Sequence, residues 1–206
     1  MEQVYYLERG SSGCRQISLK TKLFEQRVIY LDEPVDSTTV NQAVQQFTLL
    51  AALDGKQPIT LVINSPGGSI RAGLVLIDVM RSFSGPVRTV SLGIAASMAA
   101  VILAAGTHGQ RFITPHSQVM LHQPLLAGGL PGGSCSEVES VARSLMERKQ
   151  ELDDLLVRFT GRPKQEIRRL TAKDTYLKAD QAIRHGLVDA VAEGELLYDL
   201  MGGALV

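Results

Sequence analysis

Ser97 interrupts a run of alanines and large aliphatic residues, GIAASMAAVILAAG, at positions 93–106. A serine hydroxyl becomes an effective nucleophile when a base removes its proton, and the usual base is histidine. His122 follows the apolar run SQVML and precedes Gln123-Pro124, so it stands at the carboxyl end of an expected strand. Parallel sheets bind their ligands beyond this end of the strands. The two residues together predict nucleophilic catalysis.

A catalytic histidine also needs a carboxylate to orient it, and the spacing of acidic residues leaves many candidates open. Asp174 in TAKDTYL is the most suggestive, because the aromatic and apolar pair after it would anchor its loop. Structural interpretations stand beside these: Ser97 as a helix N-cap, His122 as a hydrogen-bonded core residue and Asp174 as a surface carboxylate. The remaining histidines predict ordinary surface roles; they are His108, His116 and His185.

Backbone amides near Ser97 could stabilise an oxyanion. The residue opens an expected helix, where unpaired amides and the positive end of the helix dipole favour negative charge. A second set of amides follows the strand before SPGG, where Gly67 and Gly68 allow close approach of a ligand. We expect the oxyanion hole to be built from the amides of Gly68 and Met98. Loss of one such donor typically costs about 3 kcal/mol of transition-state stabilisation.

Alternating strands and helices must position these groups. The pattern predicts a strand at 27–31, a helix at 37–53, a strand in PITLVINS, a helix at 70–82 and a strand in PVRTVSLG, followed by a helix from Ser97 to Gly106. Shorter strands are expected in GQRFITP and SQVMLH. This alternation favours parallel pairing, hence an α/β sheet with helices on its faces.

The later part of the chain predicts a different geometry. Residues 125–136, LLAGGLPGGSCS, are rich in glycine and proline and predict a loop. A long amphipathic helix should follow and end at Gly161, with its apolar stripe serving either the core of this chain or an interface. Short helices and a last strand close the domain, and the apolar tail packs on a neighbour or stays loose.

Composition narrows the functional classes. The 206 residues carry 21 basic and 21 acidic side chains, so the net charge is zero and binding to nucleic acid or a membrane surface is not expected. Cys14 and Cys135 lack the spacing of a metal or redox motif, so we expect reduced thiols. The N-terminus does not read as a secretory signal, and the best apolar run is too short to span a bilayer. We expect a cytoplasmic protein.

The ordered set INSPGGS, GIAASMAAVILAAG, RFITPHSQVMLHQP and TAKDTYLKADQAIRHGLVD resembles the proteolytic subunit of the Clp protease, the ClpP family. The resemblance implies Ser97 as nucleophile, His122 as base, Asp174 as orienting acid, and Gly68 and Met98 as oxyanion donors. It implies no metal and no organic cofactor. Substrate contacts are expected from Gly67, Ser69, Ile70, Pro124 and Leu125.

The same resemblance implies a crotonase-like fold, in which stacked ββα repeats form a head and a helical handle protrudes. It gives one ClpP-like peptidase domain over residues 1–206, with an axial N-terminal segment at 1–20, the handle at about 125–158 and a C-terminal tail at 193–206. Family members form heptameric rings stacked in pairs, and an AAA+ unfoldase ATPase feeds them unfolded protein substrates.

Three departures from the family pattern lead to a hypothesis about assembly. Thr60 and Val62 stand where tyrosines usually line the docking pocket for the ATPase. The axial segment reads GCRQISLK, and Ala172-Lys173 replaces an acidic residue and an arginine that pair across the rings. We interpret the chain as a divergent paralogue that needs a second, more typical ClpP ring for docking or activity.

Three functional classes therefore remain. The first is a serine endopeptidase of low sequence preference. The second is a weakly active or inactive structural subunit that positions other subunits in a ring. The third, suggested by the crotonase-like fold, stabilises the enolate of an acyl-CoA thioester on the two amide donors. An intact set of Ser97, His122 and Asp174 favours the first class over the third, because enolate chemistry needs no such relay.

Overall fold

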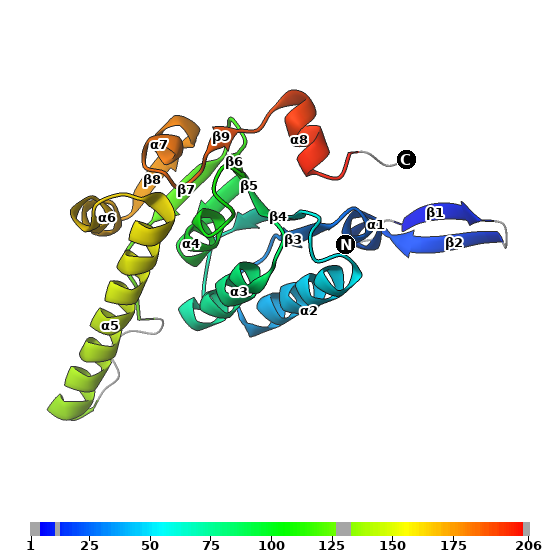
Figure 1. The fold of residues 1–206 in the computed structure, drawn as a ribbon. Helices are drawn as coiled ribbons and strands as arrows, with labels where there is room; N and C mark the ends of the chain where they lie inside the picture. The colour runs from blue at the N-terminus through cyan, green and yellow to red at the C-terminus, as the bar shows by residue number, and fades with distance from the viewer. Residues whose placement is uncertain (1–4, 11–12, 127–132, 204–206) are drawn as a thin grey trace.

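The computed structural model describes residues 5–10, 13–126 and 133–203. Its centre is a seven-stranded, largely parallel sheet with helices packed along it (Figure 1). Strands β3, β4, β5, β6 and β9 are successive neighbours, and β7 pairs with both β5 and β8. The strands are β3 (Val28–Leu31), β4 (Ile59–Ser65), β5 (Val87–Ala96), β6 (Arg111–Ile113), β7 (Gln118–Leu121), β8 (Thr175–Lys178) and β9 (Ala190–Val191). The α/β class expected from the sequence is confirmed.

Strand β5 changes its partner halfway along. Its residues 89–91 pair with β6, whereas residues 94–96 pair with β7. The change occurs around Gly93, which has a φ of 96° and donates its amide hydrogen to Ser117 Oγ at 2.6 Å. A β-carbon on Gly93 would lie 2.7 Å from Asn64 Oδ1. The sequence prediction ended this strand at Gly93; instead the glycine bends it, and β5 continues to Ala96, directly before Ser97.

Helices α2 (Ser37–Leu53), α3 (Ile70–Ser82) and α4 (Met98–Ala104) pack against the sheet and share its main hydrophobic core (Figure 1). The first two have the bounds expected from their periodicity. Asp36 begins α2 by accepting hydrogen bonds from the amides of Thr38 and Thr39. Every residue of α4 is buried, which explains its composition of small and aliphatic side chains. This helix ends before Gly106, the end expected from the sequence, because Ala105 is already its C-cap.

The long helix α5 (Cys135–Thr160) extends away from the sheet (Figure 1). It begins with a capping box between Ser134 and Glu137 and ends at Gly161, which adopts the left-handed conformation expected of a C-terminal glycine. Leu156 is buried and Leu152 packs against the core, so this half of the apolar stripe belongs to the core of the chain. Residues 127–132 of the expected loop lie outside the described residues.

A buried ion pair joins the sheet to two helix ends. Arg111 is only 1% exposed, and its Nε and Nη2 donate to Asp189 at 2.9 and 2.5 Å. Its Nη1 donates to the carbonyl oxygens of Phe159 at 2.8 Å and Ala104 at 3.3 Å. These carbonyls lie at the C-terminal ends of α5 and α4, so one guanidinium holds both helices.

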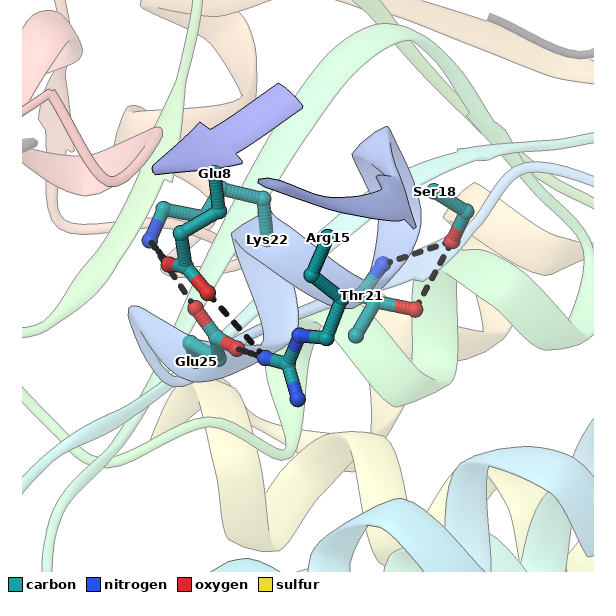
Figure 2. Close-up of polar contacts among 6 residues, drawn as sticks. All are labelled: Glu8, Arg15, Ser18, Thr21, Lys22 and Glu25. Carbon is teal, nitrogen blue, oxygen red and sulfur yellow. Dashed lines mark hydrogen bonds and ion pairs between the residues drawn. The ribbon is translucent and has the colours of Figure 1, made fainter. Parts of the chain in front are cut away.

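The axial segment expected at 1–20 contains an element that the sequence analysis did not predict. Strands β1 (Tyr5–Gly10) and β2 (Gly13–Ser18) form an antiparallel hairpin, and α1 (Leu19–Glu25) follows. Figure 2 shows the ion pairs that join hairpin and helix: Lys22 Nζ of α1 contacts Glu8 of β1 at 2.9 Å, and Arg15 of β2 lies 3.9 Å from Glu25 of α1. Residues 1–4 and 11–12 lie outside the described residues.

The chain ends with three short helices, α6 (Lys164–Thr171), α7 (Ala179–Arg184) and α8 (Gly194–Leu200). Strand β8 runs antiparallel to β7, an exception to the parallel pairing expected for the sheet. The apolar tail packs on its own chain, because Leu200 is buried against Val90 and Ala192. Residues 204–206 of this tail lie outside the described residues.

Two further expectations concern membrane-spanning helices and the two cysteines. Within residues 5–10, 13–126 and 133–203, no helix combines the length and apolar character needed to cross a membrane. Cys14 and Cys135 are exposed free thiols, as expected.

Candidate active site

Ser97 occupies a strained turn between β5 and α4. Its φ of 54° is unusual for a residue with a side chain, and such strain typically costs about 1–3 kcal/mol. The surrounding structure fixes it: the amide of Ser97 donates to the carbonyl of Met120 at 2.8 Å, and its own carbonyl accepts the amide of Ala100. The side chain makes no capping hydrogen bond with α4. The N-cap interpretation therefore describes the position of Ser97 but not the use of its hydroxyl.

The hydroxyl of Ser97 faces His122. The distance from His122 Nε2 to Ser97 Oγ is 2.8 Å, a normal hydrogen bond. His122 follows directly after β7, whose backbone pairs with the last residues of β5 before Ser97. The pairing of these two strands sets the imidazole beside the hydroxyl. Ser97 and His122 thus come from the ends of adjacent parallel strands, as expected from the sequence.

Asp174 stands behind the imidazole. Its Oδ1 lies 3.4 Å from His122 Nδ1, on the side of the ring opposite Ser97. The residue immediately precedes β8, and the pairing of β8 with β7 brings Thr175 opposite Leu121. The Asp174 side chain is 66% exposed, so its contact with the imidazole is open to water. The structure therefore brings together the three side chains that the sequence analysis selected.

Two backbone amides adjoin Ser97. The amide of Val35 donates to the carbonyl of Gly67, and the amide of Ser69 donates to the carbonyl of Val35. Gly68 lies between these two bonded groups, so its own amide points away from Val35. The Gly67 backbone lies against Ser97, because a β-carbon there would be 3.0 Å from the amide nitrogen of Met98. Within the described residues, the amides of Gly68 and Met98 donate no hydrogen bond to the protein. Both donors are available to a ligand.

These groups open onto a groove of about 930 Å³. Apart from Asp174, every predicted site residue lines it; these are Gly67, Gly68, Ser69, Ile70, Ser97, Met98, His122, Pro124 and Leu125. Ser69 has a structural role as well, because its hydroxyl caps α3 through the amide of Ala72. The volume exceeds that of a single side chain, so the groove can hold several residues of an extended peptide.

The sequence analysis missed the polar wall that α5 and α6 contribute to this groove. Lys149 and Asp153 lie one helical turn apart on α5, and Thr171 ends α6. Their spacing with Leu152 and Leu156 marks one face of α5, but periodicity alone does not say which cavity that face borders. Only the packing of α5 against α4 and α6 reveals the connection to Ser97.

The other histidines lie away from the groove. His185 contacts Glu166 at 2.7 Å, and His108 is highly exposed near Asp189. In the part of the chain that the structure describes, no cluster of histidine, cysteine and acidic side chains could hold a metal ion.

The arrangement is suited to nucleophilic attack by an alcohol. It combines a hydroxyl, an imidazole at hydrogen-bond distance, a carboxylate behind the imidazole and two free amides beside the hydroxyl. A comparison with protein families adds independent information. The family model described as Clp protease matches residues 10–195, which is most of the chain.

Proposed function

This chain belongs to the Clp protease family, and we propose on that basis that it is a serine endopeptidase in which Ser97 attacks the peptide carbonyl. The observation that carries the proposal is the 2.8 Å contact between Ser97 Oγ and His122 Nε2. It forms within one chain, so the pairing of nucleophile and base needs no residue from a neighbour.

The reaction follows from the geometry. As Ser97 Oγ bonds to the carbonyl carbon, His122 Nε2 takes the proton of the serine hydroxyl. The carbonyl oxygen becomes an oxyanion, which the amides of Gly68 and Met98 stabilise. The imidazolium then gives the proton to the departing amine, leaving an acyl group on Ser97. A water molecule then attacks the acyl group and gives a proton to His122. His122 returns this proton to Ser97 Oγ as the bond between Oγ and the acyl group breaks, which releases the peptide acid and restores the serine. Asp174 holds the imidazole in the productive orientation. Base and donors are protein groups, so no cofactor is required.

The substrate proposed is an extended, unfolded polypeptide. The groove is open and can hold several residues, and the small residues around Ser97 allow the main chain to approach. Substrate contacts would come from Gly67, Ile70, Pro124 and Leu125.

The assembly is proposed from the family. The head would be crotonase-like, the region 125–158 would form the handle, and heptameric rings would pair through these handles, with residues 1–20 at the axial pore. The handle proposal is supported by α5, which projects from the sheet and exposes Met146 by 72%. An AAA+ unfoldase is the proposed partner. Thr60 and Val62 are 5% and 1% exposed, so their side chains offer the unfoldase little surface to bind. Their burial supports docking of the unfoldase on a second, more typical ClpP paralogue.

Labelling with a fluorophosphonate tests the activity, because this reagent reacts with an activated serine. We expect labelling of the protein, alone or assembled with its paralogue, that disappears in Ser97→Ala. Ser144→Ala is a matched control: it removes another hydroxyl that lines the groove, and labelling should persist.

The other two classes give different outcomes. Absence of labelling in every assembly state would instead support the structural subunit, and turnover of an enoyl-CoA would support the enolate enzyme. Co-expression with the paralogue should yield mixed particles, whereas only homomeric particles that are fully active with the unfoldase would contradict the divergent-paralogue hypothesis.

A further inference from the structure

A buried carboxylate that the proposed reaction does not use lies in the same groove as Ser97. Asp153 on α5 is only 3% exposed, yet it lines the groove together with the nucleophile and base. Burying a carboxylate is costly unless its charge is balanced and its oxygens accept hydrogen bonds. Its bonding partners therefore indicate what else it can accept.

The two oxygens of Asp153 are occupied unequally. Oδ2 accepts a hydrogen bond from Lys149 Nζ at 3.2 Å and lies 3.7 Å from Arg168 Nε. Among the residues that the structure describes, Oδ1 accepts one long hydrogen bond, 3.4 Å from the hydroxyl of Thr171. That hydroxyl also donates to the carbonyl of Ile167 at 3.1 Å, so it is shared. A carboxylate oxygen can accept two hydrogen bonds, which leaves Oδ1 with capacity for another donor.

Apolar side chains also lie beside this carboxylate in the groove. Met98 and Val101 come from α4, and Leu152 and Leu156 come from the same face of α5 as Asp153. A substrate side chain that enters between these residues must have an apolar body. If this side chain also reaches Asp153, its tip must be a hydrogen-bond donor. Without a donor, the carboxylate would lose contact with water and gain no partner, which costs free energy.

The local charge excludes a cationic tip. Lys149 and Arg168 already balance Asp153, and Arg148 adds a further positive charge to the groove. A lysine or arginine of the substrate would meet this excess of positive charge, and an acidic side chain would meet the carboxylate itself. The remaining class is neutral, with an apolar body and a donor at its end, such as tyrosine or glutamine.

We propose that Asp153 determines specificity by accepting, on Oδ1, a hydrogen bond from the neutral donor at the tip of the substrate residue that precedes the scissile bond. Tyrosine at that position is then preferred over phenylalanine, which has the same body without the hydroxyl. The biological meaning of this preference rests on the proposed peptidase function, but the binding preference itself does not require catalysis.

Product peptides provide a test that is independent of the reaction. Two peptides that differ only in a C-terminal tyrosine or phenylalanine are titrated against the full-length Ser97→Ala protein. We expect the tyrosine peptide to bind about tenfold more tightly, since a hydrogen bond to a charged acceptor is commonly worth at least that ratio. In Ser97→Ala combined with Asp153→Leu, the two affinities should become equal.

Two further variants keep the test interpretable. Asp153→Asn retains an acceptor oxygen and should keep part of the preference, which guards against loss through misfolding. Asp154→Asn changes the neighbouring aspartate, which contacts Lys164 and does not line the groove, and it should leave the ratio unchanged. Equal binding of the two peptides to the Ser97→Ala protein, or an unchanged ratio after Asp153→Leu, overturns the proposal.

Hydrolysis separates this proposal from the function on which it rests. Peptide substrates with tyrosine or phenylalanine before the scissile bond should show the same ratio in kcat/KM with the unmodified serine. If neither is hydrolysed while the binding ratio persists, the peptidase function fails and the assignment of Asp153 stands.

Discussion

Gly67 is pressed against Ser97: a β-carbon at Gly67 would lie 2.8 Å from the Cβ of Ser97 and 2.4 Å from the carbonyl oxygen of Ala96. Contacts this short with backbone atoms cannot be relieved by rotating a side chain. Absence of a side chain at position 67 therefore sets how closely the turn carrying the Gly68 amide approaches the nucleophile.

Gly67→Ala should abolish fluorophosphonate labelling, because the added methyl group must displace either this turn or Ser97. Gly109→Ala is a matched control: its φ of 80° resembles the 84° of Gly67, but among the described residues beyond its two chain neighbours nothing lies within 4 Å of the added carbon. The control should lose about 1 kcal/mol of stability from backbone strain alone and keep its labelling. Equal labelling by the two variants would contradict the close-contact argument.

Asp174→Asn should slow peptide hydrolysis about 100-fold, at the low end of what general-base catalysis contributes. The loss is moderate because the contact with His122 is 3.4 Å long and Asp174 is largely exposed. Asp180→Asn is the comparison, since the Asp180 side chain is 63% exposed and pairs with Arg184 one turn away. Measurement of kcat for both variants checks the prediction, and similar rates for the two would remove Asp174 from the mechanism.

Asp189→Asn should destabilise the protein at neutral pH by about 3 kcal/mol, because it leaves the buried Arg111 without its counter-charge. This loss lies at the lower end of the range for breaking a buried ion pair, because the Asp189 side chain is 19% exposed. Urea unfolding measures the difference. Replacing both partners, with Arg111→Met and Asp189→Leu, should cost less than the single change if the unpaired charge is the cause.

The same ion pair predicts a pH dependence. Burial acts to raise the pKa of Asp189, but hydrogen bonds and charge from Arg111 outweigh it and the pKa is lowered. A carboxyl with a lowered pKa stabilises the fold above its unfolded pKa of about 3.9, and this contribution is lost as the pH falls through the lower folded pKa. The stability gap between wild type and Asp189→Asn should therefore be full at pH 7 and narrow below about pH 4.

Lys22→Met should loosen the N-terminal hairpin, since Lys22 of α1 makes the shorter of the two ion pairs, 2.9 Å to Glu8 of β1, that join hairpin and helix (Figure 2). The hydrogen bond with Lys22 is also the main reason that the pKa of Glu8 is lowered. Amide hydrogen exchange in residues 5–10 and 13–18 should become faster. Lys20→Met, which removes only an exposed pair with Asp32, should leave these rates unchanged. Identical exchange in both variants would show that the ion pairs do not hold the hairpin.

Local signals predicted the helices of the sheet domain well. The bounds of α2 and α3 follow from apolar periodicity and from capping side chains, Asp36 and Ser69, that lie next to the helices they begin. Ser97 and His122 were also predictable, because each lies at the end of a parallel strand and such ends meet at one edge of a sheet.

Features that depend on distant contacts were harder to predict. The hairpin β1–β2 lacks buried residues along most of β2 and is joined to α1 by ion pairs, so hydrophobic alternation could not reveal it. Glycine is typical of a strand end, which is why the sequence predicts that the strand stops at Gly93. The bend at Gly93 instead lets β5 exchange β6 for β7 as its partner. Asp153 could not be predicted as a groove residue, because the groove combines residues of α4, β7, α5 and α6. No local sequence pattern specifies how these elements pack.

Arg111 also has a mechanical consequence. Its Nη1 holds the carbonyls that end α4 and α5, and α4 begins immediately after Ser97. The same guanidinium therefore anchors the C-terminal ends of both helices. Loss of Arg111 would free the helix that follows Ser97 and the long helix α5 together.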